Sequence, residues 1–236
     1  MKHPLPLLVL LGCIFTMTMT IAAPDTNPMQ GITYNSCEVD GKFIALTFDD
    51  GPHADNSVKL LDILKQHNAK ATFFVVGNNA EKYPGLLKRM QEEGHEIGNH
   101  SWSHPHLTTM EIPDIRSELE RTSKAISDAT GQSPKIFRPP FIDTNATLEH
   151  WISKELGMKS ILCSVDSLDW RDKDPALARQ HILEGAAPGA IVLAHERAST
   201  AEALSGILDE LAARGFQFVT VSELIAMDKA GGTRTP

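Results

Sequence analysis

FIALTFDDGP, at residues 43–52, is the stretch that decides the fold. Its first six residues form a short apolar run rich in β-compatible side chains, which is typical of a buried strand. After a plausible N-cap at Asn56, residues 56–67 carry Leu61 and Leu64 at helical spacing. The sequence therefore predicts a strand, a turn and a helix, in that order.

The same alternation of strand and helix continues through the chain. Further strands are predicted at residues 71–76, 95–99, 136–137, 159–165, 190–194 and 217–219, and further helices at 80–93, 111–129, 146–156, 175–183 and 201–214. Strands that alternate with helices form right-handed parallel βαβ units. About seven such strands favour a barrel-like sheet ringed by helices, and an open doubly wound sheet is the rival architecture.

The placement of unusual polar residues favours the barrel. They stand at or just beyond the carboxyl ends of different predicted strands, and they are Asp49 with Asp50, His100, Arg138, Asp166 and His195. In a barrel these strand ends converge on one face, which is where catalytic residues are expected.

Asp49 and Asp50 are adjacent carboxylates at the exit of the first predicted strand. Successive strand side chains point to opposite sides, but a Gly51-Pro52 turn lets the chain bend so that both can address one pocket. Two nearby carboxylates repel each other unless a cation lies between them. One carboxylate can then bind the metal, and the other stays free to accept a proton. A plain surface turn is the alternative.

His100 and His104 are the second chemical signal. Two imidazoles four residues apart can reach one cation from a helical turn or a tight loop, and two histidines with a carboxylate form a common hydrolytic zinc site. The chain has ten histidines, and His95 and His106 lie nearby, so a His-rich segment without a metal is the alternative.

Together these segments resemble the polysaccharide deacetylase family, also called carbohydrate esterase family four or the NodB-homology domain. Three further segments continue the resemblance in the expected order, namely Arg138-Pro139-Pro140, Asp166-Ser167-Leu168-Asp169-Trp170 and Leu193-Ala194-His195. The resemblance covers residues 42–224. It implies an α/β fold, a distorted (β/α) barrel of about seven parallel strands ringed by helices.

The resemblance also implies a metal and two proton carriers. Asp50, His100 and His104 would bind a divalent metal, most often Zn²⁺, with Co²⁺, Mn²⁺ or Ni²⁺ as alternatives. Asp49 would be the general base that takes a proton from the attacking water. His195 is the candidate general acid for the amine that leaves.

The charged residues of the remaining motifs are expected to support these two proton carriers. Arg138 would pair with an acid and orient Asp49. Either Asp166 or Asp169 would set the protonation state of His195. Ordinary structural ion pairs are the alternative for these charges.

Three residues are expected at the substrate. A backbone N–H near Phe141 would help to stabilise the oxyanion, and Trp170 and Leu193 would line the acetyl pocket, with core packing as the alternative for these two. Phe141 stands where the family usually has Tyr or Trp, Ile142 where glycine is common, and Glu196 where Asp is more usual. Isoleucine restricts φ where glycine does not, so the geometry near Ile142 departs most from the family pattern.

The first 23 residues are expected to be a secretory signal peptide. Lys2 and His3 precede an apolar run that ends in Ala22 and Ala23, which is the pattern of a basic start, a hydrophobic middle and a small-residue exit. A membrane anchor and lipoprotein processing at Cys13 are the alternatives. The predicted organisation is a signal peptide at 1–23, an extension at 24–41, a catalytic domain at 42–228 and a flexible tail at 229–236.

The net charge and the cysteine content narrow the classes of partner that are expected for this protein. The formal charge is −8, and loss of Lys2 with the first 23 residues would make it −9. Such an acidic, exported protein is a poor ligand for nucleic acid, whereas an N-acetylated glycan is acceptable, and a membrane is expected only if Cys13 is lipidated. Cys37 and Cys163 would remain, and they could pair or stay as free thiols. The sequence carries no signal for an oligomeric state.

The predicted function is hydrolysis of N-acetyl groups on a polymer that contains N-acetylglucosamine, either chitin-like or peptidoglycan, with release of acetate. An O-acetyl esterase acting on xylan would use the same pocket. A catalytically silent carbohydrate-binding relative could dispense with Asp49 or a metal ligand, whereas this chain keeps all four residues.

Overall fold

The computed structural model describes Met1 and residues 31–231. The strands are β1 (Thr33–Tyr34), β2 (Phe43–Asp49), β3 (Thr72–Val75), β4 (Glu96–Asn99), β5 (Ile136–Phe137), β6 (Lys159–Ile161), β7 (Val165–Asp166), β8 (Ile191–His195) and β9 (Gln217–Phe218). The helices are α1 (Asn56–Gln66), α2 (Gly77–Lys82), α3 (Pro84–Glu92), α4 (Ile112–Thr130), α5 (Ala146–Leu156), α6 (Asp169–Asp172), α7 (Pro175–Gly185), α8 (Ala198–Ala213) and α9 (Val221–Ala226), with 3₁₀ turns η1 (Leu107–Thr109) and η2 (Pro140–Ile142). Residues 2–23 of the predicted signal peptide, Cys13 among them, and residues 232–236 of the predicted tail lie outside the described residues.

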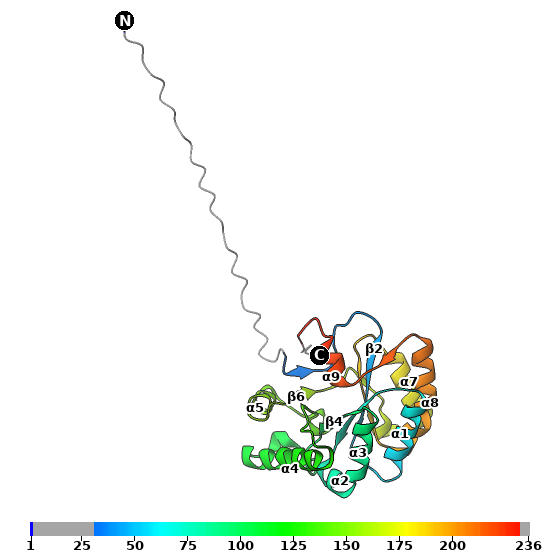
Figure 1. Ribbon diagram of the computed structural model, residues 1–236, viewed down its shortest axis with the longest axis horizontal. Helices are drawn as coiled ribbons and strands as arrows, with labels where there is room; N and C mark the ends of the chain where they lie inside the picture. The colour runs from blue at the N-terminus through cyan, green and yellow to red at the C-terminus, as the bar shows by residue number, and fades with distance from the viewer. Residues whose placement is uncertain (2–30, 232–236) are drawn as a thin grey trace.

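The strands form one curled parallel sheet in the order β1-β6-β5-β4-β3-β2-β8-β7, and β9 pairs with β2. A single segment at residues 159–166 joins the two sides of the sheet, because its first part, β6, pairs with β5 and its last part, β7, pairs with β8. Helices surround the sheet, with α1, α7 and α8 on one side and α2, α3 and α4 on another (Figure 1). The predicted distorted barrel is confirmed.

The observed elements differ from the predicted ones in several places, and the short helices α6 and α9 were not predicted. The predicted strand at 159–165 is divided into β6 and β7, and β1 adds a strand from the segment expected to be an extension. The single helix predicted at 80–93 is wrong, because α2 ends at Lys82 and α3 begins at Pro84. Proline has no N–H to donate and its ring clashes with the preceding turn, so a helix cannot run straight through this position.

The alternation of side chains along β2 places its residues in two different core clusters. Ile44, Leu46 and Phe48 point outward into the apolar layer beneath the helices, whereas Ala45 lies in the smaller cluster inside the barrel. Residues two apart share a face, so Asp49 continues the inward side of the strand. The strand that buries the core therefore also carries a carboxylate to the mouth of the barrel.

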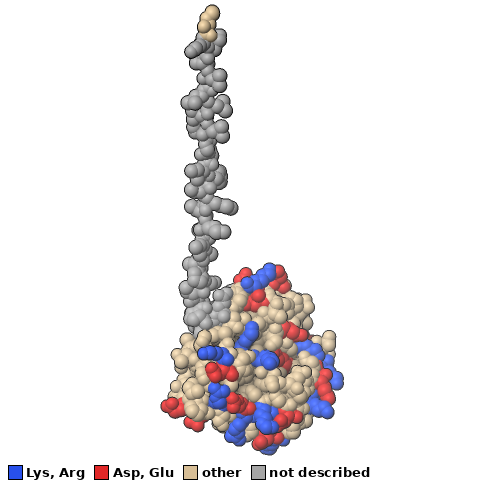
Figure 2. All heavy atoms as spheres, turned by 60° about the vertical axis from the view of Figure 1, so that its left-hand side comes forward, with Lys and Arg blue, Asp and Glu red and all other residues tan. Residues whose placement is uncertain are grey.

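The surface gives no sign of a single-sign patch on the face that Figure 2 presents. Basic and acidic side chains are interspersed there rather than gathered apart. Among the described residues, no helix has both the length and the hydropathy needed to cross a membrane. Cys37 and Cys163 form no disulfide with each other.

Candidate active site

The structure brings the predicted polar residues together at the carboxyl ends of the strands. Asp49 ends β2 and His195 ends β8, and the two are register partners in neighbouring strands. His100 follows β4 and Arg138 follows β5 directly. Convergence of parallel strands therefore assembles one site from segments that lie far apart in the sequence.

Asp50, His100 and His104 form a group that could hold a metal ion. Their ligand atoms all lie within 4.8 Å of one another. Asp50 Oδ1 is 3.6 Å from His100 Nε2 and 3.5 Å from His104 Nε2. Tetrahedral ligands about 2.1 Å from a zinc ion stand about 3.4 Å apart, so the donor set and its spacing fit a divalent ion.

The two imidazoles are presented by backbone and loop contacts. His100 is buried, and its Nδ1 atom lies 2.8 Å from the Arg138 carbonyl oxygen, which leaves Nε2 to face Asp50. This pairing of the second ring nitrogen is the usual way of orienting a metal-binding histidine. Burial lowers the pKa of His100 to about 3, so the ring is neutral and can act as a ligand.

The loop between the two histidines is fixed by Glu118, which sequence reasoning missed. Its carboxylate accepts the backbone N–H groups of Trp102 and Ser103, each at 2.8 Å. His104 then adopts a left-handed φ of 60° and donates its N–H to Ser101 Oγ at 3.0 Å. Glu118 lies on α4 and no motif marks it, because its contact depends on how that helix packs.

Asp49 is held by the Arg138 guanidinium. Arg138 is fully buried and its Nη1 atom donates to Asp49 Oδ1 at 2.8 Å and to Thr47 Oγ1 at 2.5 Å. Burial raises the pKa of Asp49, and the Arg138 charge opposes that rise. The carboxylate is therefore oriented by a cation while its other oxygen, Oδ2, stands 3.7 Å from His100 Nε2.

Asp169, rather than Asp166, pairs with His195. Asp169 Oδ1 accepts from His195 Nδ1 at 2.6 Å, and Asp169 Oδ2 accepts from the His195 backbone N–H and from Thr200 Oγ1. Asp166 instead accepts the Leu168 N–H and the Trp170 Nε1–H. The structure thus separates the two candidates that the sequence left open.

The pKa of His195 reflects this pairing. Burial lowers the pKa, but the hydrogen bond to Asp169 and the charge of Asp49 more than offset that effect and raise it above its usual 6.5. Thr200, at the start of α8, supports Asp169 and was not expected from the sequence, because a lone threonine in a helix has no distinguishing pattern.

The three residues predicted at the substrate differ in exposure. Phe141 is 57% exposed and stacks on His106, with ring centroids 4.0 Å apart, while its edge contacts His104. Trp170 is 48% exposed. Leu193 is buried and lies on the inward face of β8, two residues before His195. Phe141 and Trp170 can meet a ligand at the rim, whereas Leu193 can do so only from inside the barrel.

Strained backbone gathers around the site. Left-handed φ angles occur at Asp50, Ser101, His104, Phe141 and Ile142. The value of 55° at Ile142 is unfavourable for a β-branched residue, and glycine would adopt it without strain. Such conformations persist only where surrounding contacts enforce them, and they are common at functional sites.

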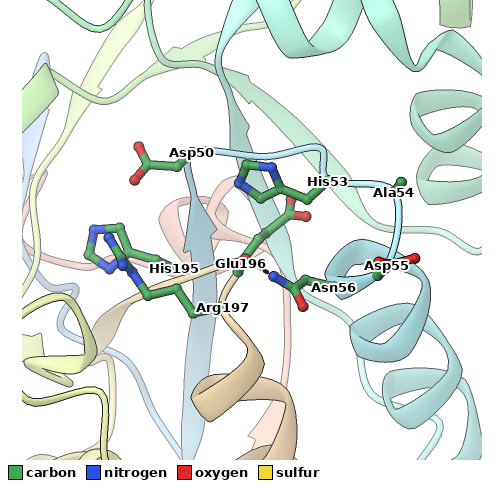
Figure 3. A pocket seen from close by; sticks show the side chains of 8 residues that line it. All are labelled: Asp50, His53, Ala54, Asp55, Asn56, His195, Glu196 and Arg197. Carbon is green, nitrogen blue, oxygen red and sulfur yellow. Dashed lines mark hydrogen bonds between the residues drawn. The ribbon is translucent and has the colours of Figure 1, made fainter.

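A side pocket of about 400 Å³ opens next to these residues (Figure 3). Its lining consists of Asp50, His53, Ala54, Asp55, Asn56, His195, Glu196 and Arg197. Because Asp50 and His195 belong to both, the side pocket is continuous with the candidate catalytic centre. None of the other lining residues was assigned a function from sequence.

Residues 37–161, just over half of the chain, match the model of the polysaccharide deacetylase family. The chain belongs to the polysaccharide deacetylase family.

Individual relatives match the chain over most of its length. The chain is 43% identical over 184 residues to the peptidoglycan-N-acetylglucosamine deacetylase PgdA of Listeria monocytogenes, and this covers 78% of the chain and 39% of that relative. It is 38% identical over 189 residues to the peptidoglycan-N-acetylmuramic acid deacetylase PdaC of Bacillus subtilis, covering 80% of the chain and 40% of PdaC. The chain thus spans about two fifths of the length of these relatives. The solved structure of the T48 deacetylase with substrate superposes with a TM-score of 0.77 at 38% identity, covering 84% of the chain and 100% of that structure.

Proposed function

We propose that this protein is a metal-dependent hydrolase that removes N-acetyl groups from amino sugars in a peptidoglycan-type glycan and releases acetate. The observation that carries the proposal is the gathering of Asp50, His100 and His104 beside Asp49. The names of the peptidoglycan deacetylases to which the chain is similar support this substrate class. Residues 42–228 would be the catalytic domain, and residues 1–23 would direct export to the compartment that holds such a glycan.

The metal is proposed to be Zn²⁺, held by Asp50, His100 and His104. When bound, it would polarise the acetyl carbonyl and lower the pKa of the attacking water. Asp49 would accept the proton of that water, since Arg138 holds this carboxylate in place and burial raises its pKa. A base with a raised pKa keeps a proton better than an ordinary aspartate does.

His195 would return a proton to the leaving amine. Its Nδ1 atom is occupied by Asp169, so Nε2 is the nitrogen that can face the substrate. Its raised pKa keeps more of the ring protonated near neutral pH. A backbone N–H near Phe141 would stabilise the oxyanion, and Phe141 and Trp170 would flank the sugar.

Acetate release from N-acetylglucosamine oligomers and from peptidoglycan tests this function directly. We expect release by the zinc-loaded protein, its loss with a chelator, and its recovery when zinc is returned. Asp49→Asn should lower the rate by roughly 10²–10⁴-fold, the range that proton transfer by a positioned side chain contributes. Matched N-acetyl and O-acetyl substrates separate this function from an esterase.

The proposal fails if folded, zinc-loaded Asp49→Asn protein releases acetate at the parental rate. Circular dichroism and metal analysis of the variant provide the control, because they show that fold and metal are retained.

A further inference from the structure

Arg197 is the arginine that lines the side pocket. Among the residues that the structure describes, it forms no ion pair, and its buried Nε atom has no hydrogen-bond partner. The other arginines in residues 31–231 all have partners: Arg89, Arg116, Arg138, Arg171, Arg179 and Arg214 pair with carboxylates, and Arg121 stacks over Trp102. A buried donor left unsatisfied is unfavourable, so a ligand that accepts a hydrogen bond from Arg197 Nε would stabilise it.

The surroundings of Arg197 add little negative charge. Glu196 is buried against Ser57, whose hydroxyl donates to its Oε2 atom, and among the described residues it forms no ion pair with Arg197. Asp50 would be neutralised as a metal ligand in the proposed function. Asp55 is exposed at the outer edge of the pocket, where solvent screens it.

Two further features favour an anion. Helix α8 begins at Ala198, directly after Arg197, and its first turn holds no acidic side chain and no side-chain cap. The positive end of the helix dipole therefore lies beside the pocket, and the Asp169 carboxylate contacts the same first turn through Thr200. Burial lowers the pKa of His53, so this neighbouring imidazole is neutral and can donate or accept a hydrogen bond without adding charge.

We propose that the side pocket binds a carboxylate carried by the glycan, with Arg197 as its ion-pair partner. This inference rests on the proposed function and narrows its substrate to an acidic amino-sugar polymer. The planar guanidinium matches a carboxylate in a two-pronged hydrogen-bonded pair. His195 and Asp50 line the same pocket, so a carboxylate bound there lies next to the reacting group.

The ether-linked lactyl group of muramic acid has the required chemistry. It places a carboxylate on the sugar carbon adjacent to the one that carries the acetamido group. The carboxylate could come from the sugar that is deacetylated or from its neighbour in an alternating polymer. A neutral chitin-like polymer offers no such group and would leave Arg197 unpaired.

A pair of oligomers that differ only in charge tests the carboxylate site. One is a peptide-free oligomer of alternating N-acetylglucosamine and N-acetylmuramic acid with free lactyl carboxylates, and the other is the same oligomer with those groups converted to methylamides. Acetate release is measured for the zinc-loaded parent protein, for Arg197→Gln and for Arg171→Gln. Arg171 is an exposed arginine already paired with Asp172, so its variant controls for the loss of one positive charge.

We expect the parent and Arg171→Gln to favour the acidic oligomer by about 10-fold or more in kcat/KM, and Arg197→Gln to bring this ratio close to 1. A charge-assisted hydrogen bond of about 1.5–3 kcal/mol corresponds to that preference. Arg197→Lys should retain part of it, because the charge remains while the two-pronged geometry is lost. The masses of the products show which sugar lost its acetyl group and thus which sugar supplied the carboxylate. The site is overturned if Arg197→Gln loses activity equally on both oligomers, or if the parent protein shows no preference for the acidic oligomer.

Calorimetry with the same oligomers keeps this test separate from that of the deacetylase. Salt-sensitive binding of the acidic oligomer by the parent and not by Arg197→Gln, without acetate from any oligomer, would support the carboxylate site and overturn the deacetylase. Acetate release at equal rates from the acidic and the methylamide oligomers would support the deacetylase and overturn the carboxylate site.

Discussion

His95 and His100 flank the same short strand, β4, and have opposite surroundings. Both rings are buried, and burial lowers both pKa values, to about 4 for His95 and about 3 for His100. His95, at the amino end of the strand, accepts the Ala71 N–H and packs its ring against Phe73.

His100, at the carboxyl end, faces acidic groups from another strand. Its Nε2 atom lies within 4 Å of oxygens on both Asp49 and Asp50. Burial and a shifted pKa are thus shared by a packing histidine and by a candidate ligand. What separates them is that loops from several strands converge at the carboxyl end of a parallel barrel.

The largest effect should come from removing the imidazole at the carboxyl end. We expect His100→Ala to lose metal and to lower acetate release by roughly a thousand-fold or more, because a catalytic metal contributes several kcal/mol. Metal analysis and acetate assays at a saturating zinc concentration measure both quantities. Full zinc content and normal turnover in the variant would remove the distinction between the two histidines.

Substitution of Asp169, at the same end of the barrel as His100, should have an intermediate effect on activity. His195 must be protonated to act as an acid, so activity falls as pH rises through its raised pKa. Asp169→Asn removes the hydrogen-bonding carboxylate that raises this pKa, while burial, which lowers it, remains. The alkaline limb of the kcat/KM profile should therefore shift to lower pH, with a loss of roughly 100-fold near neutral pH.

Asp166→Asn is the matched control for this shift. Asp166 bonds to Leu168 and Trp170 rather than to His195, so its variant should keep the parental alkaline limb. The same raised pKa of His195 stabilises the fold below pH 6.5, and that contribution is lost as pH rises through the folded-state value. The pH dependence of unfolding should therefore weaken in Asp169→Asn, and identical profiles for both variants would argue against the His195–Asp169 pair.

The sequence could predict most of the barrel and most of the polar residues at the carboxyl ends of its strands. Alternating strands and helices leave periodic apolar patterns, and charged residues at strand exits such as Asp49 and Arg138 are rare enough to be noticed. Choosing Asp169 over Asp166 was beyond the sequence, since the two lie three residues apart in one motif. The choice is made by a left-handed turn at Leu168, with φ of 56°, and by the short helix α6 that follows.

Long-range packing explains the other omissions. The strand β1 has only two residues and exists because it pairs with β6, more than a hundred residues later. Glu118 acts on the loop between the histidines only because α4 packs beside it. Neither feature leaves a periodic pattern in the sequence. The same holds for Arg197, whose lack of an ion-pair partner among residues 31–231 is visible only in the folded structure.

The smallest effect on acetate release should come from a substitution of His95, at the amino end of β4. His95→Ala leaves the buried Ala71 N–H without its acceptor, so we expect a loss of about 1–3 kcal/mol in the free energy of unfolding. Urea unfolding measures that loss, and zinc content and kcat below the unfolding transition should match the parent. If His95→Ala instead lowered kcat as His100→Ala is expected to do, burial alone would couple a histidine to this site, and the contrast between the two ends of the strand would fail.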